Sequence, residues 1–157
     1  MLMITKQLPN EEFIPFVISE LESVEGKTVT LPLRGRSMRP FLEDGRDNAL
    51  LICDKNINVN DAVLAEIAPK RFVLHRIVAI DDNKVTLLGD GNLSPEHCTL
   101  RDIKAKAIGF YRKGRKTADM TSGLKWRIYS WWWTRLYPIR RYLLFILHPH
   151  IPERLKK

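Results

Sequence analysis

Ser37 is the residue of this 157-residue chain whose surroundings most favour nucleophilic chemistry. It lies in the run Gly35-Arg36-Ser37-Met38-Arg39-Pro40, directly after the β-branched and apolar run 28–33. A serine hydroxyl is a poor nucleophile at neutral pH, so it needs an adjacent base and a fixed geometry. A tight turn at a strand end can supply that geometry, with backbone N–H groups gathered around a developing oxyanion. Taken alone, a serine in such a turn more often satisfies local hydrogen bonds.

Two further residues could complete a catalytic group with Ser37. His75 lies in the run 71–80, where strand alternation puts it on an apolar face and Arg76 on the opposite face. Asp90, in the turn Leu88-Gly89-Asp90-Gly91-Asn92, could hold an imidazole in the tautomer that a base requires. Each residue also has a simpler interpretation, His75 as a hydrogen-bonded core histidine and Asp90 as part of an Asp-Gly turn. Only the combination indicates a nucleophile, a base and an orienting acid.

Taken in chain order, these segments resemble the type I signal peptidases and the related self-cleaving SOS-type repressors. The family's Ser-Met-x-Pro box matches Ser37-Met38-Arg39-Pro40, and its base-bearing strand is similar to the strand with His75-Arg76. The later Gly-Asp-Asn box of the family resembles Gly89-Asp90-Gly91-Asn92, and the similarity covers residues 29–112. The main bacterial enzymes and the repressors use lysine as base, whereas the endoplasmic-reticulum and sporulation-type enzymes use histidine. The histidine at position 75 therefore relates this chain to the second branch.

The resemblance implies a serine endopeptidase that needs no cofactor and cleaves a leader or precursor peptide. Ser37 would attack the scissile carbonyl and its backbone N–H would stabilise the oxyanion, while His75 would transfer the proton and Asp90 would orient His75. Gly91 interrupts the family's acidic box, which makes Glu96 and Asp102 alternative acids. The same residues leave open a second function, that of a non-catalytic protein with this fold that binds a peptide or membrane partner.

Alternating turn-rich and apolar segments predict the elements that must position these residues. Asn10 can cap a helix from Glu11 to about Val24. Six short runs then favour strands, at 28–33, 49–53, 62–67, 72–80, 85–88 and 104–111. They predict a mainly β fold, an antiparallel coiled sheet or partial barrel, which the resemblance identifies with the signal-peptidase and SOS-repressor type. The expected organisation is an N-terminal helix in 1–27, a β peptidase-like domain in 28–116 and a helical tail in 117–157.

Composition and charge separate the tail from the rest. A hydrophobic content of 45% and a charged content of 28% are ordinary for one folded domain. The net charge of +8 is unevenly placed, because residues 121–157 carry +7 and residues 1–120 only +1. A partner attracted by positive charge should therefore meet the tail.

The tail combines aromatic and basic residues, with a break expected at Pro138. This combination favours the interface of an anionic membrane. It could also bind single-stranded nucleic acid by stacking, or fold Trp131–Trp133 back on the β domain as packing. We expect the membrane contact and no nucleic-acid partner, because the β domain is nearly neutral. The residues expected at the interface are Trp126, Trp131, Trp132, Trp133, Arg135, Arg140 and Arg141.

Other chemistry has little support. Cys53 and Cys98 form neither a CxxC motif nor a metal-ligand pattern, although a disulfide between them stays open, and we expect no metal. The first ten residues lack the apolar region of a secretory signal, and no run reaches the ~20 apolar residues of a membrane span. We therefore expect a cytoplasmic protein, peripheral at the inner face of the membrane.

Overall fold

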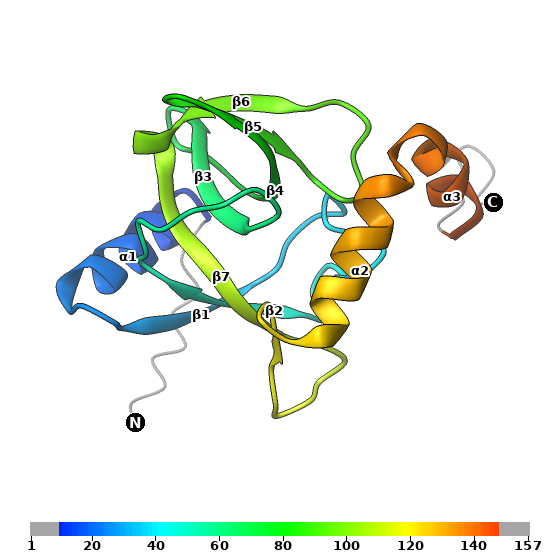
Figure 1. Ribbon diagram of the computed structural model, residues 1–157. Helices are drawn as coiled ribbons and strands as arrows, with labels where there is room; N and C mark the ends of the chain where they lie inside the picture. Colours follow the sequence, from blue (N-terminus) through cyan, green and yellow to red (C-terminus); the bar gives the residue numbers. More distant parts are fainter. Residues whose placement is uncertain (1–9, 148–157) are drawn as a thin grey trace, which may run out of the picture.

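The computed structural model describes residues 10–147, which form one antiparallel sheet flanked by helices (Figure 1). The sheet has eight strands in the order β1-β2-β7-β3-β4-β5-β6, with β8 paired to β7, and every pair is antiparallel. The strands are β1 (Thr28–Pro32), β2 (Asn48–Ile52), β3 (Ala62–Ala68), β4 (Arg71–Asp81), β5 (Lys84–Leu88), β6 (Glu96–Thr99), β7 (Ile103–Tyr111) and β8 (Asp119–Met120).

The sheet is open and strongly coiled. The register shifts within the pairs β2–β7, β3–β4, β3–β7 and β4–β5, and such irregularities increase the local twist of a sheet. As a result, β6 contacts β3 although β4 and β5 lie between them in the strand order. This coiling brings side chains of β4 and β6 together, which matters for the site below.

Helices flank the coiled sheet on opposite sides (Figure 1). The blue helix α1 (Asn10–Ser23) packs on β1 and buries Val17 and Leu21, which are one helical turn apart. On the other side lie the orange helix α2 (Leu124–Arg135), the 3-10 turn η2 (Tyr137–Ile139) and the helix α3 (Arg140–Leu147). Pro138 separates α2 from α3 because proline has no N–H to continue the helical hydrogen bonds. Within residues 10–147, no helix combines the length and the apolar character needed to cross a membrane.

Two clusters of buried side chains form the core. The larger cluster joins α1, β1, β2 and β7 to α2 through Val17, Leu51, Phe110 and Trp126. The smaller cluster lies among β3 to β6 and includes Val63, Ile77, Leu87 and Cys98. Because Trp126 belongs to the larger cluster, α2 packs as part of the body and not as a separate appendage.

The structure confirms the mainly β, antiparallel fold with an N-terminal helix and C-terminal helices. All six predicted strands are present, with ends that differ by at most one residue. Sequence patterns did not indicate β6 or β8. The strand β6 has four residues, of which only Cys98 is buried, and β8 has two residues, so neither shows a clear alternation. The short 3-10 helix η1 (Leu100–Asp102) follows β6 directly.

Candidate active site

Ser37 lies in a turn that follows β1 and is fixed by local contacts. Gly35 takes a φ of 84°, in the region that favours glycine, and its N–H donates to Asp44 Oδ1 at 2.9 Å. The Arg39 N–H donates back to the Arg36 carbonyl at 3.2 Å. Beside the partly exposed Ser37, Met38 is buried in the larger core cluster. The turn is therefore anchored on one side and leaves Ser37 at the surface.

The turn that follows β5 packs tightly against the Ser37 turn. The Gly91 N–H donates to the Ser37 carbonyl oxygen at 2.7 Å. A Cβ atom at Gly89 would collide with that same carbonyl oxygen and would lie 3.1 Å from His75 Cδ2. The Ser37 backbone and the His75 imidazole therefore both border the position that a side chain at residue 89 would occupy. Glycine is required at this position by close approach, since its φ is not in the left-handed region.

His75 is buried on β4 and faces Glu96 of β6. Its Nδ1 lies 2.9 Å from Glu96 Oε2, although the angles at these atoms are not those of a good hydrogen bond. The other oxygen of Glu96, Oε1, accepts from Arg71 Nη2 at 3.2 Å. Cδ2, which belongs to the other side of the imidazole, is the His75 atom that lies closest to Gly89 and so to the Ser37 backbone carbonyl. This is how a carboxylate presents the second nitrogen of an imidazole as a base.

Burial lowers the pKa of His75 below its ordinary value of 6.5, because the charged imidazolium is poorly solvated in the fold. The Glu96 carboxylate opposes this effect and favours the charged form. Burial is the larger influence, so His75 is neutral at pH 7. A neutral imidazole beside a carboxylate can accept a proton, because the carboxylate stabilises the imidazolium that forms.

Within residues 10–147, the carbonyl is the polar group of Ser37 that has a hydrogen-bond partner. Among residues 10–147, the Ser37 hydroxyl forms no hydrogen bond, and this includes any bond to His75. The Ser37 N–H likewise has no acceptor in the described part of the chain. Catalytic hydrogen bonds are often long or poorly aligned before substrate binds, and an unpaired N–H is what an oxyanion donor requires.

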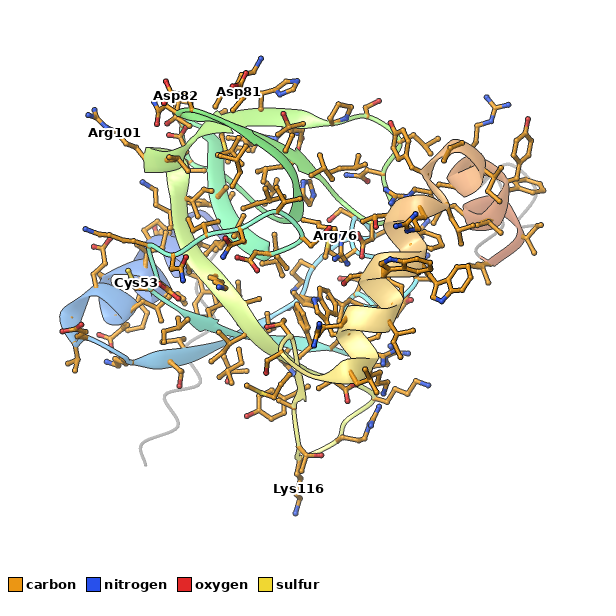
Figure 2. The ribbon with its side chains drawn as sticks, viewed as in Figure 1. Cys53, Arg76, Asp81, Asp82, Arg101 and Lys116 are labelled. Carbon is orange, nitrogen blue, oxygen red and sulfur yellow. The ribbon has the colours of Figure 1, made fainter. Side chains whose placement is uncertain are left out.

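The Asp90 carboxylate is engaged by Arg76 and Tyr129, and within residues 10–147 it forms no hydrogen bond with His75. Both carboxylate oxygens accept from Arg76, from Nε and from Nη2 at 2.8 Å each, and Tyr129 Oη donates to Oδ2 at 2.8 Å. The side chains of Arg76 and Asp90 are each 1% exposed. Figure 2 shows Arg76 in the space between β4 and α2. Asp90 therefore does not orient His75 in this structure; it joins the sheet to α2.

Further contacts extend this join along α2. Arg76 Nη1 donates to Ser130 Oγ at 2.6 Å, and its guanidinium carbon lies 4.8 Å from the centre of the Trp126 ring. Trp133 Nε1 donates to the Asp90 carbonyl at 3.0 Å. The turn that contains Asp90 also bonds the Ser37 carbonyl through Gly91, so the contacts of α2 with Asp90 stabilise the position of the Ser37 turn. Sequence reasoning placed Arg76 opposite His75 but found no partner for it.

Asp102, the other alternative acid, is engaged elsewhere. Its Oδ2 accepts from the Thr99 N–H at 2.7 Å and from the Thr99 hydroxyl at 2.9 Å, which caps the short helix η1. Of the three acids considered from the sequence, Glu96 is the one that the structure brings to His75. The coiling of the sheet produces this approach, and no spacing in the sequence indicates it.

The residues expected at a membrane interface divide into two groups. Trp126, Trp133 and Arg140 are buried, with exposed fractions of 4%, 5% and 1%. Arg140 lies 5.2 Å from the centres of the Trp133 and Tyr137 rings, and its burial lowers its pKa. These three pack on the body; of Trp131–Trp133, which the packing alternative placed there, Trp133 is buried and the other two are exposed. The exposed members are Trp131, Trp132, Arg135 and Arg141.

Neither cysteine chemistry nor a metal has support in the described residues. Cys53 is exposed and Cys98 is buried, and the two are not bonded to each other. Burial raises the pKa of the Cys98 thiol to about 11, which disfavours a reactive thiolate. Between residues 10 and 147, no cluster of His, Cys, Asp and Glu has the arrangement of a metal site.

No protein-family model matches the sequence, and a search of curated proteins gave no match either.

Proposed function

We propose that this chain is a signal-peptidase-like serine endopeptidase with Ser37 as nucleophile, His75 as general base and Glu96 as the acid that orients His75. The observation that carries the proposal is the arrangement around His75. Glu96 lies at Nδ1, and the opposite edge of the ring meets the Ser37 turn over Gly89. This order of nucleophile, imidazole and carboxylate is that of a catalytic triad, with glutamate in the third place.

In the proposed reaction, His75 Nε2 takes the proton of the Ser37 hydroxyl as Oγ attacks the scissile carbonyl carbon. The Ser37 N–H donates to the oxyanion that forms, and Glu96 stabilises the imidazolium. His75 then protonates the leaving amine, which breaks the peptide bond and leaves an acyl ester on Ser37. A water molecule, activated by His75, hydrolyses this ester and restores the free hydroxyl.

A proteome-derived peptide library tests the proposal, because it offers many candidate cleavage sites at once. Purified protein should generate new peptide ends in the library, and both Ser37→Ala and His75→Ala should abolish them. Matched controls are Ser94→Ala, an exposed serine in the loop after Asn92, and His97→Ala, an exposed histidine on β6. Both control variants should cleave like the wild type.

Two results would count against the proposal. Cleavage that persists in Ser37→Ala would remove the nucleophile from the assigned role. If the wild type retains library peptides but produces no new ends, the non-catalytic alternative, a peptide-binding protein on this fold, would take its place.

A further inference from the structure

The helix α2 has two opposed stripes of side chains. The buried stripe, formed by Trp126, Tyr129, Ser130 and Trp133, holds the sheet. The opposite side of α2 carries Leu124, Ile128 and Trp131, which follow one another at intervals of about one helical turn. These side chains are 71%, 50% and 49% exposed. A surface helix normally presents polar residues on its outer side. Large apolar residues there indicate a surface with a partner.

The apolar surface continues on α3. Tyr142, Phe145 and Ile146 are 61%, 68% and 72% exposed, at the spacing of one helical face. In Figure 1, α3 lies next to the end of α2 and away from the sheet, so nothing in the described chain covers these side chains. We call the exposed residues of both helices the outer face. Its apolar members are Leu124, Ile128, Trp131, Trp132, Tyr142, Phe145, Ile146 and Leu147.

Positive charge surrounds the outer face. Residues 124–147 contain no acidic side chain. Arg127, Arg135 and Arg141 are exposed, and none of them has an acidic partner within residues 10–147. The guanidinium carbon of Arg135 lies 4.2 Å from the centre of the Trp131 ring, and that of Arg141 lies 5.1 Å from the Tyr142 ring. Cations therefore sit directly beside the exposed aromatic rings.

We propose that the outer face of α2 and α3 is a docking surface for an anionic lipid bilayer. Aliphatic and aromatic side chains enter the boundary between headgroups and acyl chains, and arginines beside them contact anionic headgroups. Single-stranded nucleic acid fits less well, because Leu124, Ile128 and Ile146 offer no ring on which a base can stack. The positive charge and the mixture of aliphatic and aromatic side chains together favour an anionic lipid surface over single-stranded nucleic acid.

Docking through this face also fixes where the Ser37 turn lies. The buried stripe of the same helix grips Asp90, whose turn holds the Ser37 carbonyl through Gly91. A bilayer on the outer face would therefore hold the site beside the membrane surface. The docking surface does not depend on the peptidase proposal, so Ser37→Ala should dock like the wild type.

Vesicle sedimentation with the full chain tests the docking surface. Wild-type protein should sediment with phosphatidylcholine vesicles that contain phosphatidylglycerol, and much less with phosphatidylcholine alone. A charge variant, Arg127→Gln/Arg135→Gln/Arg141→Gln, should bind the anionic vesicles about 100-fold more weakly. An apolar variant, Ile128→Ser/Phe145→Ser/Ile146→Ser, should lose at least about 10-fold on the same vesicles.

The matched control is Val24→Ser/Val59→Ser, which removes apolar side chains that are 59% and 47% exposed on other parts of the molecule. It should bind like the wild type, and circular dichroism should show that every variant is folded. Wild-type protein that stays in the supernatant, or a charge variant that sediments fully, would overturn the proposal. So would a dimer that only the apolar variant abolishes, or preferential binding of single-stranded DNA that the charge variant loses.

Discussion

Replacing Asp90 by asparagine tests what this residue does in the fold. Its two oxygens accept from Arg76 at 2.8 Å each, Tyr129 donates to one of them, and the paired side chains are each 1% exposed. Asparagine keeps the shape but leaves a buried guanidinium without a counter-charge. Breaking a buried ion pair from one side costs about 3–5 kcal/mol. That is a large part of the ~5–15 kcal/mol by which a typical domain is stable.

The expected change is large enough for a simple assay. For a chain of this size, each kcal/mol lowers the melting temperature by about 2–4 °C, so Asp90→Asn should melt roughly 6–20 °C below the wild type. Trp126 and Trp133 contact Arg76 and Asp90, so tryptophan fluorescence reports directly on this region during urea or thermal unfolding. Circular dichroism on the same samples follows the sheet and the helices together.

Asp102→Asn is the matched control, because Asp102 is an acid that caps an exposed turn. Its loss should cost about 1 kcal/mol. The structural role of Asp90 would be refuted if Asp90→Asn had the melting temperature of the wild type yet lost cleavage. Asp90 would then act on His75 during catalysis, and the ion pair with Arg76 would contribute little to the fold.

Two other predictions concern the site itself. Glu96→Gln should lower the cleavage rate by about 100-fold or more, and it should move the acid limb of the pH profile to lower pH, because the Glu96 carboxylate raises the His75 pKa. In the wild type, burial lowers the His75 pKa, so kcat/KM should fall to half its maximum only below pH 6.5. A midpoint above pH 6.5 would contradict the assignment of His75 as the base. Gly89→Ala should abolish most cleavage and cost about 1–3 kcal/mol, because its methyl group collides with the Ser37 carbonyl. Gly26→Ala, at a φ of 75° in open space, should cost about 1 kcal/mol in urea unfolding and cleave normally, and equal cleavage by both variants would exclude the packing argument.

The sequence predicted the sheet well because its strands carry local patterns. The run around His75 is mostly apolar and is bounded by turn residues, and strand geometry also placed Arg76 on the face opposite His75, where it reaches Asp90. The role of Asp90 was less accessible. Its partner Arg76 is 14 residues away, and their meeting depends on how the turn after β5 folds over β4 and α2. The proximity of Glu96 to His75 depends on the coiling of the sheet, which no local pattern records.

The spacing of the tryptophans in the tail does indicate which of them are buried. Trp126 and Trp133 are seven residues apart and therefore lie on one side of a helix, whereas Trp131 falls on the opposite side with Ile128. A helical projection of these positions separates the residues that the structure buries from those that it exposes. The stripe that faces the sheet is the one that provides Ser130 for the Arg76 side chain and Tyr129 for the Asp90 side chain.

Two kinds of arginine, the buried Arg76 that contacts α2 and the exposed arginines of the outer face, respond differently to ionic strength. The Arg76–Asp90 pair is shielded from water, and dissolved ions screen such a pair weakly. Exposed arginines of the outer face act through solution, where attraction fades within about 8 Å at physiological salt. Concentrated salt should therefore release the protein from an anionic membrane while α2 stays seated on the sheet. A salt wash without detergent would then recover the chain with its Ser37 turn still in place.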